Sequence, residues 1–296
     1  MSPFNFLSVL VSLVASLPLA RSAFSAGLSF AGVPLTPGAT VSANVPLSAL
    51  EKSYVAEGGN AVPPYTLAML AVPPGFDPKK SWPVMVVFSS SDHAHQNRDD
   101  LRMIYRRTAL AEGWVLIAGD GPEPAPRLDS SGWRAGHTLA ALDALNRSFP
   151  GSKQWPIACA GQSGGAKRAS YLTPLLAVAG YRIIGIFLEG ITQEEMPPPP
   201  EPAVSNYWVI AYPRGCCEGI TEGYRRFQPG SSFLRTPIFL STGLFDKVAR
   251  PEQQTAVEES MRRTGFANIR HETFPGGHTV LRTHVVEALR WFRKGL

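Results

Sequence analysis

The chain has 296 residues, of which 44% are hydrophobic and 17% charged, and its formal net charge is +5. This length is enough for one large α/β domain, and the balance of apolar and charged residues excludes an intrinsically disordered chain. Basic residues occur in dispersed pairs, such as Arg106-Arg107 and Arg262-Arg263, and not as a block with interleaved aromatics. We therefore do not expect nucleic-acid binding.

The N-terminal segment has the pattern of an export signal. Residues 4–20 are mostly apolar, and small residues stand at positions 20 and 22. This pattern predicts a signal peptide over residues 1–22 and a secreted or periplasmic protein. Asn5, Pro18 and several serines interrupt the run, so no stable membrane span is expected. The alternative interpretation is an N-terminal arm, either disordered or packed.

Strand and helix signals alternate through most of the remaining chain. Residues 24–60 are rich in Gly, Pro, Ser and Ala, which predicts an exposed lead-in with one strand at 40–45. Further strands are predicted over 65–72, 82–88, 114–118, 155–160, 182–188, 237–241 and 268–274. Helices are predicted over 101–113, around 139–145, from 166 to a stop at Pro174, and over about 280–294. This order predicts a mainly parallel twisted sheet with helices on both faces, in a single domain over 23–296.

The segment Gly161-Gln162-Ser163-Gly164-Gly165 stands between a predicted strand and a predicted helix. A Gly-x-Ser-x-Gly in that place is a nucleophile elbow, a tight turn that presents the serine hydroxyl. Small residues at 161, 164 and 165 allow the strand and the helix to approach closely. The segment therefore predicts that Ser163 is a catalytic nucleophile, against the alternative of a plain glycine-rich turn.

A serine nucleophile needs a base, and the base needs a carboxylate that orients it; in this motif both follow the serine along the chain. Asp246 comes just after the strand predicted at 237–241, and His278 lies in a Gly-Gly-His loop between the last strand and the last helix. We predict these two as acid and base. Glu189, directly after the preceding strand, is the competing carboxylate, and the alternative for Asp246 is a cap for the helix that begins near Pro251.

The other histidines fit the base position less well. His271 lies within a predicted strand, His284 within the last helix, and His137 is expected on a helix surface. His93 and His95 follow an early strand and could contact substrate. For His278 the alternative is a solvent-facing loop histidine.

An oxyanion hole requires two N–H groups fixed where negative charge develops. The backbone of Gly164, directly after the nucleophile, is the predicted first donor. The second is expected in the loop after the strand at 82–88, from Ser90 or Ser91. Lys167 and Arg168, a short distance past the nucleophile, are expected on the helix surface, with a contact to an acidic substrate group as the alternative.

The chain has three cysteines, so at least one thiol is unpaired within a monomer. Cys159 is expected to be a small buried hydrophobe, while Cys216 and Cys217 could pair with each other or one of them with a distant thiol. No Cys/His spacing suggests zinc, and no metal or cofactor is expected. The segment 191–235 carries a four-proline run and several aromatics, and we expect it to form a partial cap over the site.

With these motifs the chain resembles the α/β-hydrolases, and among them the extracellular polyhydroxyalkanoate depolymerases and feruloyl or acetylxylan esterases. The resemblance spans roughly residues 65–296 and rests on these segments: Pro73-Pro74-Gly75-Phe76-Asp77-Pro78, residues 82–88, Gly161–Gly165, Gly243-Leu244-Phe245-Asp246 and Gly276-Gly277-His278. It implies an α/β-hydrolase fold and a Ser163-Asp246-His278 triad. The chain departs from the family in having Ser89-Ser90 where His-Gly is usual after the third strand.

These features together predict a secreted serine hydrolase that cleaves carboxylic esters, either small or linked to a polymer, through an acyl-enzyme. A serine peptidase of the same fold and a non-catalytic binding protein are the alternatives. The sequence does not define the acyl group or the alcohol of the substrate.

Overall fold

The computed structural model describes residues 27–89, 96–123, 131–192 and 219–296. Several predictions concern residues outside these ranges. They are the signal peptide at 1–22, the oxyanion donors Ser90 and Ser91, the histidines at 93 and 95, and the cysteines at 216 and 217.

The fold is built on an eight-stranded sheet in the order β10-β9-β8-β7-β5-β6-β4-β3. The strands are β3 (Thr40–Val45), β4 (Thr66–Ala71), β5 (Val84–Phe88), β6 (Val115–Asp120), β7 (Ile157–Gln162), β8 (Ile183–Glu189), β9 (Ile238–Gly243) and β10 (Ile269–Phe274). Strand β4 runs antiparallel to both β3 and β6, and the pairs from β6 to β10 are parallel. The predicted mainly parallel sheet is confirmed.

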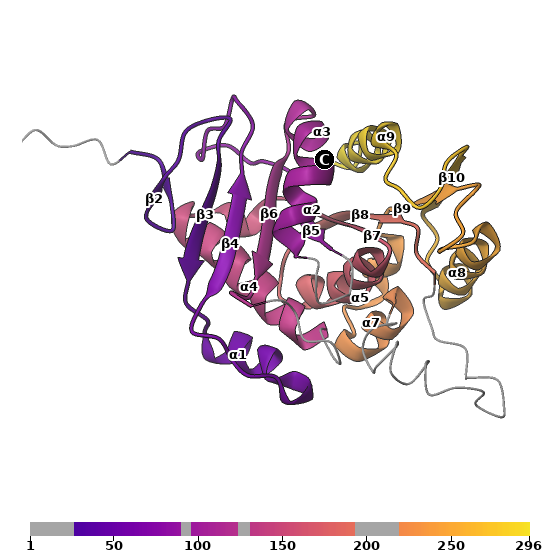
Figure 1. Cartoon of the computed structure of the whole chain (residues 1–296), viewed down its shortest axis with the longest axis horizontal. Helices are drawn as coiled ribbons and strands as arrows, with labels where there is room; N and C mark the ends of the chain where they lie inside the picture. Colours follow the sequence, from indigo (N-terminus) through magenta and orange to yellow (C-terminus); the bar gives the residue numbers. More distant parts are fainter. Residues whose placement is uncertain (1–26, 90–95, 124–130, 193–218) are drawn as a thin grey trace, which may run out of the picture.

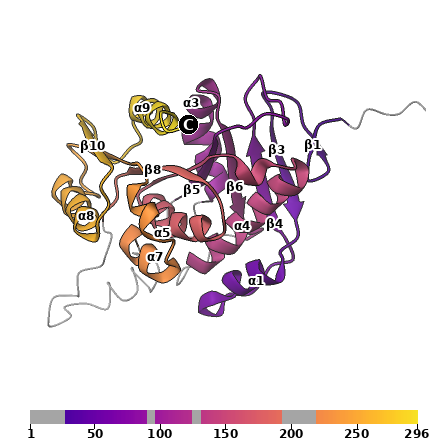
Figure 2. The same ribbon diagram turned by 180° about the vertical axis from the view of Figure 1, so that it is seen from behind.

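Helices cover both faces of this sheet (Figures 1 and 2). They are α1 (Ala49–Val55), α2 (Asn97–Asp100), α3 (Arg106–Ala111), α4 (Ser131–Ser148), α5 (Gly164–Val178), α7 (Ile220–Phe227), α8 (Pro251–Thr264) and α9 (Arg282–Arg293). A π-helical turn, Leu101–Tyr105, joins α2 to α3. Alternate residues of the strands fill two apolar cores, because successive side chains of a strand point to opposite faces. One core includes α4 and α5, and the other includes α3 and α9.

The N-terminal segment is packed more closely than its composition predicts. The strand at 40–45 is confirmed, but a two-stranded hairpin, β1 (Ser29–Phe30) with β2 (Val33–Pro34), precedes it, and α1 follows it. Ser48 begins α1 with a capping box, in which its hydroxyl and the Glu51 carboxylate each satisfy a backbone N–H group. Phe30 and Val55 are fully buried in the core. The prediction of an exposed lead-in is therefore wrong, because its few apolar residues are spaced to face α4.

Helix α5 does not end at Pro174, as predicted, but continues to Val178. Proline removes one intrahelical hydrogen bond and disfavours a helix interior. Here Leu172, Leu175 and Leu176 are all buried in the core on either side of Pro174. The apolar area buried by the longer helix outweighs the lost bond.

Part of the segment expected to cap the site is described. Helix α7 lies against α5, closely enough that a Cβ on Gly223 would come 2.3 Å from the carbonyl oxygen of Tyr171. Phe233, in the short 3-10 helix that follows, is buried in the core. Residues 219–235 therefore pack onto the body of the fold, and residues 193–218 of the expected cap lie outside the described ranges.

The strand order sets the place of the site. The chain passes from β5 to β6 in one direction, and then crosses to β7 and continues through β8, β9 and β10 in the other. The carboxyl ends of β5 and β7 meet where this reversal occurs, which is where open α/β sheets bind ligands. Ser163 follows β7 at that point.

Candidate active site

Ser163 occupies a strained turn between β7 and α5. Its backbone has φ 55° and ψ −122°, a region that L-residues with a side chain rarely adopt. The turn is held from both sides: Ser163 N donates to the Glu189 carbonyl (2.8 Å), and the Ser163 carbonyl accepts from Lys167 N (3.2 Å). Strain of this kind persists only where the surrounding structure imposes it, and it is typical of functional sites.

The glycines of the elbow are required by close packing. A Cβ on Gly161 would lie 2.2 Å from the carbonyl group of Gly165, and a Cβ on Gly165 would lie 2.3 Å from the carbonyl oxygen of Phe88. Both contacts are with backbone, which has little freedom to move. The start of α5 is therefore pressed against β7 and the end of β5.

Asp246 and His278 form a hydrogen-bonded pair. The Nδ1 atom of His278 lies 2.7 Å from Oδ2 of Asp246, whose side chain is fully buried, while the imidazole is partly exposed. The other carboxylate oxygen, Oδ1, accepts from the backbone N–H groups of Val248 and Ala249, each at 2.8 Å. A carboxylate held in this way fixes the imidazole orientation and places a proton on Nδ1, so that Nε2 can accept one.

Asp246 does not cap helix α8. The residue that flanks the helix start is Arg250, four residues later, and the carboxylate of Asp246 is used by its own loop and by His278. The alternative interpretation of Asp246 is therefore wrong. The sequence distance to Pro251 was the signal that separated the two interpretations.

The loops that carry the acid and the base are joined to each other. Leu244 N donates to the Phe274 carbonyl, and Phe245 N donates to the Gly276 carbonyl, each at 2.8 Å. The acid and base loops therefore share main-chain hydrogen bonds next to the side-chain pair.

The base loop lies beside the nucleophile turn. The Gln162 side-chain amide donates to the carbonyl of His278 (3.1 Å), so the residue before Ser163 contacts the main chain of His278. A Cβ on Gly190 would lie 2.9 Å from Cε1 of His278. The residue before Gly190 is Glu189, whose carbonyl accepts the hydrogen bond from Ser163 N. The structure thus brings residues 163, 246 and 278 to the same edge of the sheet.

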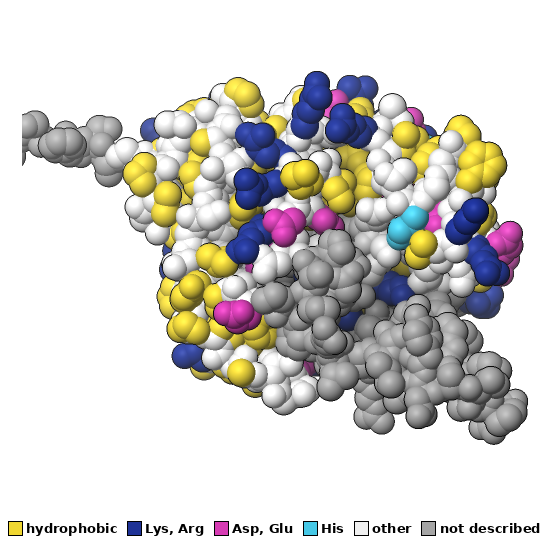
Figure 3. Space-filling view, viewed as in Figure 1, with side chains coloured by type: hydrophobic (Ala, Val, Ile, Leu, Met, Phe, Trp, Pro, Cys, Tyr) yellow, Lys and Arg dark blue, Asp and Glu magenta, His cyan; other side chains and the backbone are white. Residues whose placement is uncertain are grey.

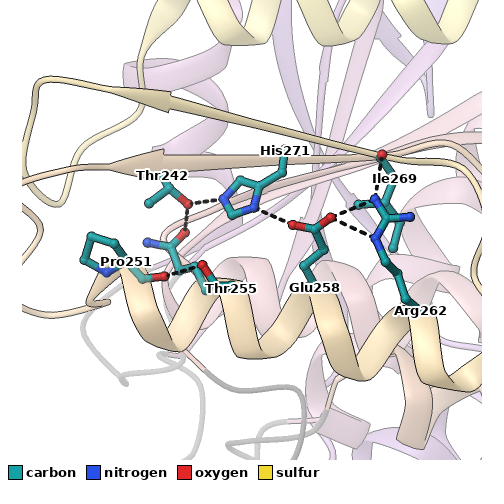
Figure 4. A network of polar contacts seen from close by, with 8 residues as sticks. Thr242, Pro251, Thr255, Glu258, Arg262, Ile269 and His271 are labelled. Atoms are coloured by element: carbon teal, nitrogen blue, oxygen red, sulfur yellow. Dashed lines mark hydrogen bonds and ion pairs between the residues drawn. The ribbon is translucent and has the colours of Figure 1, made fainter.

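The other described histidines have structural partners. Figure 4 shows His271 between Thr242 and Glu258: Nε2 lies 2.8 Å from the threonine hydroxyl, and Nδ1 lies 2.7 Å from the glutamate carboxylate. The hydroxyl of Thr242 also donates to the side chain of Gln254 (2.8 Å) on α8. His271 therefore ties β10 to β9 and α8.

His137 and His284 are also held inside the fold. His137 is fully buried, where Nδ1 contacts the Thr66 hydroxyl (2.7 Å), and burial lowers its pKa to about 3. The prediction that His137 lies on a helix surface is wrong, because its face of α4 packs against the sheet. His284 Nδ1 lies 2.8 Å from the Ser241 hydroxyl, and burial lowers its pKa.

Glu189, the competing carboxylate, is in a different environment from Asp246. It is fully buried, and neither carboxyl oxygen has a hydrogen-bond partner among the residues that the structure describes. Burial raises the pKa of Glu189 to about 8, and the charge of Asp246 acts in the same direction. The nearby Ser241 hydroxyl opposes this shift but is engaged by His284. Glu189 is therefore protonated at neutral pH, which does not suit a triad carboxylate.

Gly164 is the first residue of α5, and its N–H belongs to the unpaired groups at the helix start. These groups carry partial positive charge, which favours an anion. The predicted second donors, Ser90 and Ser91, lie outside the described residues. The residue before them, Ser89, is buried and donates its N–H to the side chain of Asn97 (2.9 Å).

Lys167 and Arg168 are buried, and the prediction of a helix-surface position is wrong for both. Arg168 donates to the Ser131 hydroxyl (2.6 Å) at the start of α4. Arg168 therefore lies on the face of α5 that turns toward α4 instead of solvent. On the face in Figure 3, the exposed basic side chains are scattered among acidic and apolar ones.

Cys159 is buried, as predicted, and its thiol is free; burial raises the pKa of this thiol to about 12. It is therefore not a reactive thiolate at neutral pH. Within the described ranges, no cluster of three or more His, Cys, Asp or Glu side chains could hold a metal ion. In the same part of the chain, no helix is both long and apolar enough to cross a membrane.

Comparison with solved structures defines the fold class. An α/β-hydrolase from Vibrio vulnificus is 16% identical, with 78% of this chain and 77% of that chain aligned at a TM-score of 0.55. A ferulic acid esterase is 14% identical over 88% of this chain and 100% of that chain, also at 0.55. Dipeptidyl peptidase 4 from Porphyromonas gingivalis is 12% identical at 0.55, and this chain matches 36% of its length.

No protein-family model matches the chain, and no match was found among curated proteins. The structural likeness, together with the sheet order and the elbow, shows that the chain has the α/β-hydrolase fold. The fold class expected from the sequence is confirmed.

Proposed function

We propose that this protein is a serine hydrolase of carboxylic esters that uses Ser163 as nucleophile, His278 as base and Asp246 as the carboxylate that orients it. The observation that carries the proposal is the 2.7 Å pair between His278 and Asp246, together with the hydrogen bond that joins the His278 carbonyl to Gln162, the residue before the strained Ser163. A strained serine and a carboxylate-oriented imidazole at one sheet edge are the parts that nucleophilic acyl transfer needs.

The reaction proceeds in two halves. Nε2 of His278 removes the proton of the Ser163 hydroxyl as its oxygen attacks the ester carbonyl, and the resulting imidazolium protonates the departing alkoxide. Water, deprotonated by the same nitrogen, then attacks the acyl-enzyme and releases the acid and the free serine. The N–H of Gly164 and a second donor at Ser90 or Ser91 stabilise the oxyanion in each half.

The substrate is a carboxylic ester, either small or attached to a polymer, and the chemistry uses no metal or cofactor. The apolar N-terminal segment supports the further proposal that the protein acts outside the cytoplasm, as a secreted or periplasmic enzyme. Detection of the protein truncated after residue 22 in a periplasmic or culture fraction would test this point. Recovery of the untruncated chain only in the cytoplasm would contradict it.

Fluorophosphonate labelling and p-nitrophenyl ester turnover test the activity. The wild-type protein should be labelled once, at Ser163, and Ser163→Ala should lose labelling and about 10⁴-fold or more of the turnover. Ser170→Ala is the matched control, because Ser170 is a buried serine of the same helix whose hydroxyl donates to the Lys167 carbonyl. Ser170→Ala should keep both the labelling and the turnover of the wild type.

The rival functions give different results in the same assays. A peptidase would cleave peptide amides as well as esters, whereas the proposed esterase should turn over the p-nitrophenyl ester with no measurable peptide cleavage. A binding protein would show neither labelling nor turnover. Either result would overturn the proposed ester hydrolase.

A further inference from the structure

Asn97 is the centre of a buried hydrogen-bond network at the end of β5. Its Oδ1 atom accepts from the backbone N–H of Ser89 (2.9 Å) and lies 3.3 Å from the Ser89 hydroxyl. Both residues are fully buried. The network thus joins the residue directly after β5 to the first residue of α2.

Arg134 and the main chain of β6 hold the Asn97 side-chain amide in place. Arg134 of α4 donates from Nη1 to Oδ1 of Asn97 (2.6 Å) and to the hydroxyl of Ser89 (3.1 Å). The Asn97 amide in turn donates to the Gly119 carbonyl of β6 (2.9 Å). Every polar atom of the amide therefore has a partner, and its orientation is fixed.

Asp120 completes the network from the end of β6. Its carboxylate accepts from the backbone N–H groups of Asn97 (2.8 Å) and Arg98 (2.9 Å). Burial raises the pKa of Asp120, while the Arg134 charge and these two N–H groups oppose the rise. A buried carboxylate, a buried guanidinium and a buried amide are costly to desolvate, so their placement here calls for a reason beyond filling space.

The network lies against the nucleophile turn. A Cβ on Gly165 would come 2.3 Å from the Phe88 carbonyl oxygen and 2.8 Å from the carbonyl carbon of Ser89. The main chain at Ser89 is therefore in contact with the start of α5, where Gly164 provides the first oxyanion donor. A shift of Ser89 would change the spacing between that donor and any donor that follows Ser89.

We propose that Asn97 is a positioning residue for oxyanion stabilisation, which fixes the main chain at Ser89 against the nucleophile turn and is itself held by Arg134 and Asp120. The inference rests on the proposed ester hydrolase. Donors of an oxyanion hole act because they are fixed before the charge develops. A small displacement of a donor therefore reduces the stabilisation of the transition state more than the binding of the substrate.

Asn97→Leu tests this role, since it keeps the approximate size of the side chain and removes the bond to Ser89. We expect kcat to fall by about 10- to 100-fold while KM stays within about threefold. The inhibition constant of a trifluoromethyl ketone, which forms an oxyanion on the serine, should rise by the same factor as kcat falls. A purely structural role would not link these two quantities.

Asn97→Asp and Arg134→Lys distinguish the loss of the contact between Asn97 and Ser89 from a general loss of stability. Aspartate keeps the oxygen that accepts from Ser89 and Arg134 but loses the donor to the Gly119 carbonyl, so part of kcat should return relative to Asn97→Leu. Lysine keeps the charge near Asp120 but is shorter than arginine, so its ammonium falls short of the Nη1 position that donates to both Asn97 and Ser89. It should therefore show a smaller parallel loss of kcat and inhibitor binding. Arg134→Lys also gives an answer if Asn97→Leu does not fold.

Thr66→Val is the stability control. It removes another buried hydrogen bond, from Thr66 to His137, and should lower the melting temperature without changing kcat or inhibitor binding. An Asn97→Leu variant that loses only thermal stability, or an Asn97→Asp variant as slow as Asn97→Leu, would overturn the inference. In those cases the wild-type enzyme stays active and Ser163→Ala inactive, whereas an inactive wild type would overturn the proposed function as well.

Discussion

Gly190 and His278 are in direct contact: a Cβ at residue 190 would lie 2.9 Å from Cε1 and 3.0 Å from Nδ1 of the imidazole. Gly190 has φ +58° and follows β8. The absence of a side chain at this position is therefore what allows the imidazole to lie over the strand end and reach Asp246.

Gly190→Ala should displace the imidazole and break its 2.7 Å bond to Asp246. We expect kcat for a p-nitrophenyl ester to fall by about 10- to 100-fold, and the left-handed backbone to cost about 1–2 kcal/mol of stability. Gly151→Ala is the control, because Gly151 has φ +99° but nothing within 4 Å of its Cβ position. It should lose stability and keep kcat; equal activity of the two variants would contradict the prediction.

Asp246→Asn should lower kcat by about 10³- to 10⁴-fold, because an amide beside Nδ1 favours the tautomer with the proton on the wrong nitrogen. The matched control is Glu258→Gln, which alters the other carboxylate–imidazole pair, at His271. That variant should change the melting temperature and leave turnover within about twofold. Similar kinetic losses in both variants would show that Asp246 has no special part in the reaction.

Gly165→Ala should unfold the elbow or prevent its formation. The added methyl would meet the backbone of Phe88 at 2.3 Å, a contact that only movement of β5 or α5 can relieve. We expect little soluble protein, a lowered melting temperature and no measurable turnover. Gly75→Ala, where nothing lies within 4 Å of the Cβ position, should behave as the wild type. A folded and active Gly165→Ala protein would contradict the packing described for this turn.

Glu189 should make the protein less stable as the pH rises. Its pKa is about 8 in the folded state, against the ordinary value of 4.5 for an unfolded chain. Between these values the unfolded state releases the proton and the folded state keeps it, so the free energy of unfolding falls from about pH 5 to pH 8. Below this range both states are protonated, and Glu189 adds no pH dependence.

Glu189→Gln removes this titration. The melting temperature of the variant, measured relative to wild type, should therefore increase steadily between pH 5 and pH 8 in thermal denaturation experiments. A constant difference across that range would show that the carboxyl at 189 is ionised at neutral pH in the folded protein.

The fold and the residues proposed for the triad could be predicted because their signals are local. The strand at 82–88 is a continuous apolar run, the elbow is five adjacent residues, and Asp246 and His278 each follow a strand at the edge where such sites form. None of these inferences required knowledge of which helices pack together.

The environments of buried polar residues could not be predicted in this way. Arg168 is enclosed because its face of α5 turns toward α4, and His137 because its face of α4 packs against the sheet, which residue type alone does not indicate. The network at Asn97 was missed for the same reason, because its bonds span residues 89 to 134. The weak signals available were an aspartate directly after a buried strand and an asparagine at the start of a helix.

The reversal of strand order between β5 and β7 places the Asn97 network and the proposed triad in two different halves of the polypeptide. The Asn97 network comes from residues before Gly151, and the serine, carboxylate and imidazole come from residues after it. The two halves meet along the β5–β7 pairing, from Val84 with Ile157 to Phe88 with Gly161. A chain cut at Gly151 would therefore give two fragments that each lack ester-hydrolase activity. Turnover on mixing the fragments would show that the β5–β7 pairing had formed again.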